Sequence, residues 1–202
     1  MGPSDRVVTG WTAPGQGDLS NQALGDRPGA EVQPFGSVRR FSIGLADEAR
    51  RSSCQLLNSI LADTVILYSL YNKHQRLVRG LTFAQLHLVF TRHADEQLEL
   101  IDLLAERVQT LGGVAVGDAR HVAEVTAIPR PPNGAEEVPA MLSRLLEAHE
   151  IVIAKVRDAI EAAAISADEG TVDLLSGDVL RRHERQAWFL AEHLVPPPPA
   201  RE

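Results

Sequence analysis

The chain has 202 residues, 44% of them hydrophobic, with 20 Lys and Arg against 27 Asp and Glu. This is enough for one buried core, and nothing indicates a second folded domain. The formal charge of −7 argues against a nucleic-acid-binding protein and favours attraction of cations. The single Cys54 excludes an intramolecular disulfide framework. Residues 1–20 lack the apolar segment of a signal peptide, and no run of 18 apolar residues occurs, so we expect a cytoplasmic protein without a membrane span.

The first 40 residues are rich in Gly and Pro and lack apolar periodicity, which predicts a flexible N-terminal tail. The charges of this tail cancel, so it would be a poor electrostatic arm for DNA: Arg6, Arg27, Arg39 and Arg40 stand against Asp5, Asp18, Asp26 and Glu31. Residues 196–202 predict a Pro-rich C-terminal stub. The folded domain is therefore expected over residues 41–195.

Apolar residues recur at helical spacing in four long segments, which predict helices over about 45–78, 83–111, 135–165 and 170–194. A shorter helix is expected near 118–125, before a Pro-rich stretch. Gly112 and Gly113 would end the second long helix in the left-handed conformation that helix C-termini favour. No alternating strand pattern competes. The predicted fold is all-α, a ferritin-like four-helix bundle with a long crossover that contains a short helix.

The second long helix carries a candidate metal site. Counted from His87 at about 100° per residue, Asp102 lies about 60°, Asp95 about 80° and Glu106 about 100° around the helix axis. Carboxylate oxygens and an imidazole suit iron or zinc. The alternative is a solvated acidic face, where most helical carboxylates belong. Because Leu98 and other apolar residues share this sector, the pattern favours the metal site.

Three motifs resemble the Dps (DNA protection during starvation) mini-ferritins. They are IDLLAERVQTLGGVA at 101–115, RGLTFAQLH at 79–87 and AWFL at 187–190, and the resemblance covers about residues 41–195. It implies a cage of twelve subunits that stores ferric iron. It also implies a ferroxidase site at the two-fold interface, where His87 of one subunit faces Asp102 and Glu106 of another. Iron(II) bound there would be oxidised, preferably by hydrogen peroxide.

The chain departs from the family at two ligand positions. The family usually has a His-Trp pair five and four residues before the glycine that corresponds to Gly80, and this chain has Gln75 and Arg76 there. The family usually has an acidic residue four positions after the Leu-His pair, and this chain has Thr91 there. A carboxamide and a hydroxyl are weak substitutes for imidazole and carboxylate toward iron(II). We therefore expect an unusual ligand set, with Gln75, Thr91 and Asp95 as auxiliary residues at most.

Other histidines could replace the missing imidazole. His74 lies beside the vacant position, and His183 lies on the apolar face of the fourth long helix, so we take both as candidate metal ligands. His149, on the inner face of the third, is an auxiliary candidate that is more simply a core histidine. His93 is expected on the surface. Trp188 is a further auxiliary candidate, for which packing is favoured.

Three functions remain open. The first is an active ferroxidase, with zinc as a competing ion. The second is an attenuated shell with a structural or zinc-binding role. The third is a nucleoid-associated protein, which the neutral tail and the acidic total make the weakest of the three.

Overall fold

The computed structural model describes residues 31–40 and 42–195. By its contacts the chain divides into residues 1–32 and residues 33–202, and all described helices belong to the second unit. The first contributes only the exposed Glu31 and Val32 to the described residues. The predicted Pro-rich stub at 196–202 and most of the predicted tail lie outside them.

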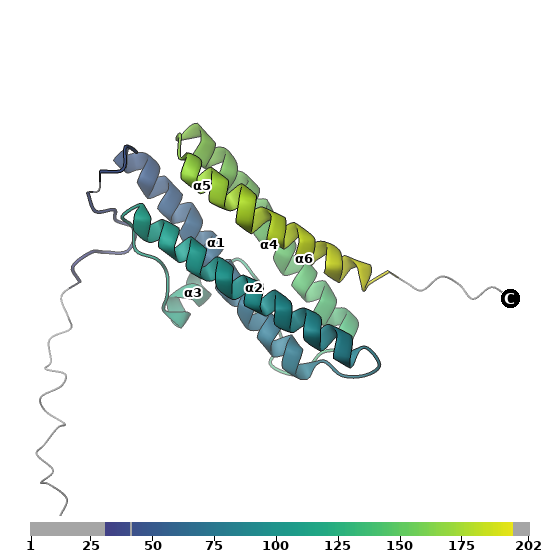
Figure 1. Cartoon of the computed structure of the whole chain (residues 1–202). Coiled ribbons are helices and arrows are strands. Elements are labelled where there is room, and N and C mark those ends of the chain that lie inside the picture. The colour runs from purple at the N-terminus through teal and green to yellow at the C-terminus, as the bar shows by residue number, and fades with distance from the viewer. Residues whose placement is uncertain (1–30, 41, 196–202) are drawn as a thin grey trace, which may run out of the picture. The chain divides into compact units, whose positions relative to one another are not determined.

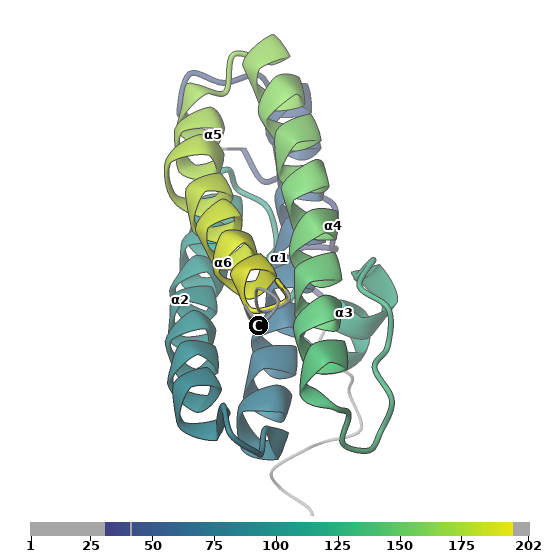
Figure 2. The same ribbon diagram turned by 90° about the vertical axis from the view of Figure 1, so that its right-hand side faces the viewer.

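The second unit is a bundle of four long helical segments that lie side by side (Figures 1 and 2). Its elements are α1 (Asp47–Leu77), α2 (Phe83–Thr110), α3 (Ala119–Val125), α4 (Val138–Ile165), α5 (Glu169–Leu174), a π-helical segment (Leu175–Leu180) and α6 (Arg181–Glu192). No strand occurs in the described residues. The predicted all-α four-helix bundle is confirmed, with its long crossover that contains a short helix.

The hairpin of α1 and α2 is bounded by residues that suit helix ends. Asp47 and Glu48 lie in the first turn of α1, where carboxylates interact favourably with the helix dipole. Gly80 turns the chain with a φ of 94°. After α2, Gly112 adopts a φ of 85°, and the backbone N–H of Gly113 donates to the carbonyl of Val108 at 2.9 Å. This is the predicted left-handed C-terminal cap.

The crossover between α2 and α4 is fastened to α1 by Asp63, whose side chain is fully buried. One oxygen of Asp63 accepts hydrogen bonds from the Thr126 hydroxyl and the Ala127 backbone N–H, both at 2.7 Å. The other oxygen accepts a 2.6 Å charged hydrogen bond from Lys155 of α4. A single carboxylate therefore joins α1, the crossover and α4.

The fourth long segment is interrupted, whereas the sequence predicts one regular helix. Asp168 caps α5 by accepting from the Thr171 backbone N–H at 3.1 Å, and the π-helical segment separates α5 from α6. A π turn contains an extra residue and so rotates the positions that follow it. In this register His183, Gln186 and Leu190 are buried in the bundle.

The core is built from the inner stripes of all four long segments, with Leu57, Phe90, Leu104, Leu145 and Val179 among its fully buried side chains. By length and composition α1 could cross a membrane, but 61% of its most apolar window is buried inside the bundle. Its apolar residues are therefore used in packing against the other helices.

The predicted tail ends earlier than expected. The backbone N–H of Arg39 donates to the carbonyl of Gly112 at 2.9 Å, and the Gln33 side chain donates to the same carbonyl at 2.8 Å. Buried Arg50 of α1 donates to the carbonyls of Arg39 and Leu111, both at 2.9 Å. Residues 33–40 therefore pack on the bundle, because the carbonyls exposed at the end of α2 provide hydrogen-bond acceptors.

Candidate metal site

His87 lies near the start of α2, and its ring has a defined orientation. Its Nδ1 is 3.1 Å from the backbone carbonyl of Gln75, and its ring packs 5.4 Å from that of Phe83. A carbonyl oxygen can only accept a hydrogen bond, so Nδ1 carries a proton, and in the neutral ring Nε2 then has the free lone pair. A hydrogen bond of this kind is what usually orients a metal-binding imidazole. The half-buried ring is thus ready to bind a cation through Nε2.

The two residues that replace family ligands lie next to His87 and contact each other. The Gln75 carboxamide donates to the Thr91 hydroxyl at 3.0 Å, and that hydroxyl donates to the carbonyl of His87 at 2.7 Å. Both side chains are therefore used within the subunit. In this arrangement, neither offers the charge of a carboxylate nor the basicity of an imidazole.

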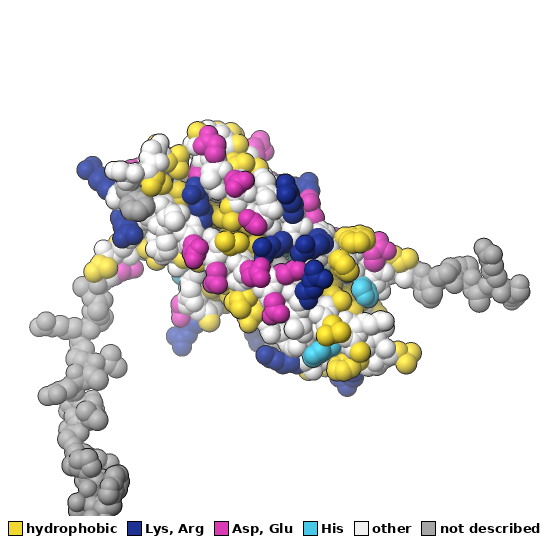
Figure 3. Space-filling view, in the orientation of Figure 1, with side chains coloured by type: hydrophobic (Ala, Val, Ile, Leu, Met, Phe, Trp, Pro, Cys, Tyr) yellow, Lys and Arg dark blue, Asp and Glu magenta, His cyan; other side chains and the backbone are white. Residues whose placement is uncertain are grey.

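Asp102 and Glu106 are exposed on the outer face of α2, as is Asp95. Figure 3 shows acidic side chains along this face, with Lys and Arg side chains beside them. At 1.5 Å per residue, Asp102 is about 22 Å and Glu106 about 28 Å along the helix from His87. Sharing a face is therefore not sufficient for one subunit to assemble the site. Within the described ranges no three His, Cys, Asp or Glu side chains are grouped to hold a metal ion.

The other candidate ligands are enclosed in the bundle. His74 is fully buried on α1, and neither ring nitrogen has a hydrogen-bond partner. Burial lowers its pKa to about 4. His183 is fully buried on α6, with Nδ1 2.9 Å from Nδ1 of His149 and with Nε2 unpartnered. The structure thus gives His74 and His183 interior surroundings, unlike the half-buried His87.

His93 is buried, so the prediction that it lies on the surface is wrong. It falls in the inner stripe of α2, three residues after Phe90, and its Nδ1 lies 3.0 Å from the Tyr71 hydroxyl. The Tyr71 hydroxyl is also 2.6 Å from Nε2 of His149. Burial lowers the pKa of His93 to about 4, that of His183 to about 3 and that of His149 well below its ordinary value.

A second polar pair lies one turn further along the interior. The Gln97 carboxamide donates to Gln186 at 2.8 Å, and Gln186 donates to Glu96 at 2.6 Å. The side-chain oxygen of Gln97 is buried without a partner. Together with Tyr71 of α1, His93 of α2, His149 of α4 and His183 of α6, these residues form a polar layer inside the bundle. The sequence predicted an inner-face position only for His149 and His183.

Trp188 is 58% exposed, so the packing role expected for it within the subunit is not observed. Its Nε1 donates to Glu192 at 3.1 Å, and its ring stacks edge-on against Phe189. Further exposed apolar side chains lie on α2 and the turn before it: Leu81, Phe83, Leu88 and Leu98.

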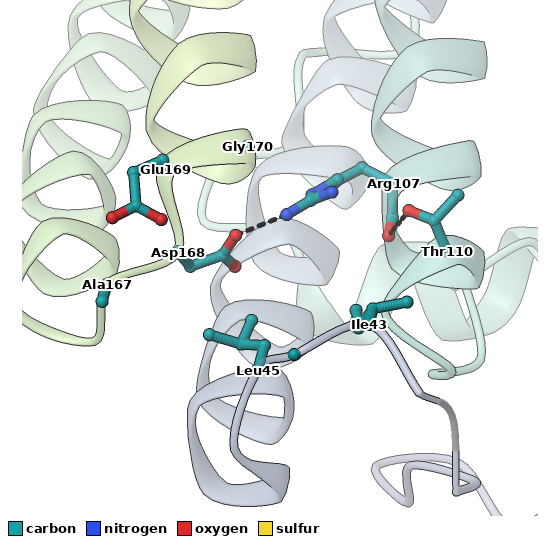
Figure 4. A pocket seen from close by; sticks show the side chains of 9 residues that line it. Ile43, Leu45, Arg107, Thr110, Ala167, Asp168, Glu169 and Gly170 are labelled. Atoms are coloured by element: carbon teal, nitrogen blue, oxygen red, sulfur yellow. Dashed lines mark hydrogen bonds and ion pairs between the residues drawn. The ribbon is translucent and has the colours of Figure 1, made fainter.

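Arg107, which follows Glu106, has a structural partner. It forms an ion pair with Asp168 (Figure 4). Its Nε also donates to the Thr171 hydroxyl at 3.0 Å. Arg107 and Asp168 line an open pocket of about 440 Å³ between the end of α2 and the start of α5. A Cβ on Gly170 would approach the Arg107 guanidinium to 2.8 Å, so this glycine leaves space for the pair. Asp168 is therefore both the N-cap of α5 and the ion-pair partner of Arg107.

The chain is similar in sequence and in structure to known proteins. Residues 54–196 match the ferritin-like domain family. The solved structure of DpsC from Streptomyces coelicolor is 58% identical, with a TM-score of 0.83, and covers 85% of this chain and 99% of its own. The Dps structure from Thermosynechococcus elongatus is 30% identical, with a TM-score of 0.71, over 74% and 94%. A nutrient stress-induced DNA-binding protein of Synechococcus is 30% identical over 82% of this chain and 93% of its own length.

Proposed function

The chain belongs to the ferritin-like domain family and, within it, to the Dps mini-ferritins, and from this membership we propose that it oxidises iron(II) with hydrogen peroxide. Membership indicates iron binding and storage. The oxidant, the twelve-subunit cage and the residues that bind iron are our proposals. The observation that carries them is His87, whose Nδ1–H is held by a carbonyl so that Nε2 is free for a cation.

In the proposed site, Nε2 of His87 binds iron(II) together with Asp102 and Glu106 of a second subunit. The helix geometry requires this second subunit, because His87 and Asp102 of one chain lie about 22 Å apart along α2. The two carboxylates offset the charge of one divalent ion. Gln75 and Thr91 bind each other and leave positions for water or peroxide. The site therefore holds one iron ion by three side chains.

Leu88 and Leu98 support the pairing of subunits through this face. Leu88 is 69% exposed and Leu98 is 45% exposed. Both lie within about 100° of His87 around the α2 axis, so they share its face of the helix. Leucines flanking a charged ligand set are typical of a surface that is covered on assembly. We propose that the cage closes through this face.

Replacing Asp102 and Glu106 together by Ala tests the site. We expect the tightest phase of anaerobic iron(II) binding in calorimetry to disappear and iron oxidation by peroxide to slow at least tenfold, because these groups supply the negative charge at the ion. The matched control is Asp158→Ala with Glu161→Ala, which removes two exposed carboxylates from α4. If the tight phase survived the first double substitution, iron would bind elsewhere.

The Gln75–Thr91 hydrogen bond favours one second candidate function, an attenuated shell that binds zinc or iron without rapid oxidation. The same calorimetry separates the two. Tight binding with an oxidation rate no faster than that of iron(II) in buffer would support the shell, and rapid oxidation would exclude it.

Assembly gives a further prediction. Light scattering at micromolar subunit concentration should report a mass near twelve subunits, and Leu88→Glu with Leu98→Glu should shift the population to smaller species. Carboxylates at these positions would be buried unpaired at the proposed interface, which is costly. A stable monomer for the unmodified chain would contradict the proposed cage.

DNA binding is expected to be weak, although a relative is named as DNA-binding. The first 40 residues carry no net charge and the whole chain carries −7, so few counterions would be released on binding. The purified cage should not retard plasmid DNA in a gel at physiological salt. Retardation that is lost on deleting residues 1–30 would contradict this. We place the protein in the cytoplasm.

A further inference from the structure

The pattern Arg-Arg-X-Ser occurs twice in the chain. The first copy contains Arg39, Arg40 and Ser42, and the second contains Arg50, Arg51 and Ser53. Protein kinases select many substrates by charge, and a kinase whose substrate groove carries carboxylates binds basic side chains that precede the serine. The sequence gives the two copies equal standing, and their surroundings in the structure distinguish them.

The second copy is closed by the fold. Ser53 lies within α1 and is 1% exposed, and its hydroxyl donates to Asp168 at 2.6 Å. The Arg50 side chain is also buried, where it donates to the carbonyls of Arg39 and Leu111. A kinase binds its substrate as an extended segment, so it would reach Ser53 only after α1 had unfolded.

The first copy is open to solvent. Arg39, Arg40 and Ser42 are exposed and precede α1, outside any helix. Ile43, which follows the serine, is 42% exposed. Among the described residues, none forms a hydrogen bond with Ser42 or Ile43. An exposed segment of this kind can take the extended form that a kinase groove accepts.

Few contacts hold this segment to the bundle. The backbone N–H of Arg39 donates to the carbonyl of Gly112, and the carbonyl of Arg39 accepts from Arg50, both at 2.9 Å. These contacts can open while α1 and α2 stay folded. Local opening of an exposed segment costs much less free energy than unfolding of the bundle.

We propose that Ser42 is a phosphorylation site for a serine/threonine kinase that recognises the pair Arg39 and Arg40. The co-substrate is ATP with Mg²⁺, which the kinase holds. The Ser42 oxygen forms a bond to the γ-phosphorus as the bond from this phosphorus to the β-phosphate oxygen breaks, and ADP leaves. The hydroxyl proton passes to the catalytic Asp of the kinase. The phosphoserine carries a charge of about −1.5 to −2 at pH 7.

The phosphate would lie among charged groups at the start of α1. The hydrogen bond from Arg50 lowers the pKa of Asp47, and the charge of Arg40 adds to this effect, so Arg40 is near Asp47. A phosphate on Ser42 competes with Asp47 for the Arg40 guanidinium. Asp47 and Glu48 already occupy the positive end of the α1 dipole, so the phosphate meets like charges there.

Phosphorylation should therefore loosen residues 33–40 from the end of α2. The hydrogen bonds that dock this segment to Gly112 and Arg50 end at Arg39, just before the modified serine. Repulsion between the phosphate and the first turn of α1 favours the undocked form of the segment. The modification would thus control how the N-terminal segment is held.

Labelling of the assembled full-length protein tests the site. The probe is the catalytic subunit of cyclic-AMP-dependent protein kinase, which recognises paired arginines before a serine, supplied with ATP and Mg²⁺. Peptide mass spectrometry should locate phosphate on Ser42 in the parent and none there in Ser42→Ala. Arg39→Gln with Arg40→Gln keeps the backbone contacts and should slow the labelling at least about tenfold, because both charge contacts with the kinase are lost.

Ser53 is the matched control within the same chain. Synthetic peptides 36–47 and 47–58 present the two copies of the pattern without the fold, so the kinase should label both. In the folded protein, Ser53 should be labelled at least about a hundredfold more slowly than Ser42, because only unfolding exposes it.

Three results would overturn the phosphorylation site. If peptide 36–47 were labelled but Ser42 of the folded protein were not, the fold would close the first copy as it closes the second. Equal labelling of Ser42 and Ser53 would show that the fold does not select between them. A peptide 36–47 that the kinase left unlabelled would show that the arginine pair is not sufficient for recognition.

Hydrogen exchange measures the effect on docking. In the phosphorylated protein, the amide protons of residues 33–40 should exchange several-fold faster than in Ser42→Ala treated with the same kinase, and those in the interior of α1 should not change. Unchanged exchange over residues 33–40 would overturn the effect on docking and leave the phosphorylation site.

Discussion

Lowering the pH from 7 to 5 should reduce the free energy of unfolding by about 5 kcal/mol per subunit, because buried neutral histidines bind protons only after unfolding. Burial lowers the pKa of His74 and His93 to about 4 and that of His183 to about 3, from an ordinary value of 6.5. His149 is shifted in the same direction.

The sign follows from the order of these values. Above pH 6.5 the histidines are neutral in both states and do not affect the free energy of unfolding. As the pH falls below 6.5, the unfolded chain binds protons that the folded bundle excludes, so stability decreases until the pH reaches the folded values near 4. The loss therefore occurs between about pH 6.5 and 4, before most carboxylates titrate.

Urea unfolding at one fixed subunit concentration, at several pH values, measures this effect. The informative variant is His74→Leu, because both ring nitrogens of His74 are buried without a partner. It should be at least as stable as the parent at pH 7 and should bind about one proton fewer on unfolding at pH 5. His193→Asn, at an exposed position, should leave the pH dependence unchanged. A flat stability between pH 7 and 5 would contradict the prediction.

Periodicity and glycine position were sufficient to predict the helices. The four long segments lie within a few residues of their predicted bounds, apart from the π-helical interruption, and Gly112 has the expected positive φ. These features depend on local sequence. His93 is the exception on α2, because the sequence predicted a surface position and the residue lies in the inner stripe between Phe90 and Gln97. Its angle of about 120° from His87 does not give its position relative to the apolar stripe.

Other features depend on partners that are distant in sequence. The docking of residues 33–40 requires the carbonyl of Gly112, which lies 79 residues after Gln33 in the sequence. The metal site is the strongest example. An angular projection places His87 and Asp102 on one face but contains no axial distance, so only the rise along the helix shows that a second subunit is needed.

Asp63 was not identified from the sequence, because an acidic residue in an apolar stripe carries no local sign of its partners. After the pH dependence described above, substitution of Asp63 should have the largest effect on the free energy of unfolding. Asp63→Ala should lower the free energy of unfolding by about 3–5 kcal/mol, since it leaves Lys155 without its buried counter-charge and the Ala127 N–H without an acceptor.

Two variants separate the contributions of charge and hydrogen bonding at this position. Asp63→Asn keeps a carbonyl oxygen for Thr126 and Ala127 but loses the charge facing Lys155, so its loss should be smaller than that of Asp63→Ala. Lys155 is partly exposed and can turn toward solvent, which limits the cost of losing the ion pair. Asp158→Ala, at an exposed position of α4, should stay within about 0.5 kcal/mol of the parent. Equal unfolding midpoints in urea for Asp63→Ala and Asp158→Ala would show that the crossover is held by its apolar contacts, such as that of Ile128, and not by this carboxylate.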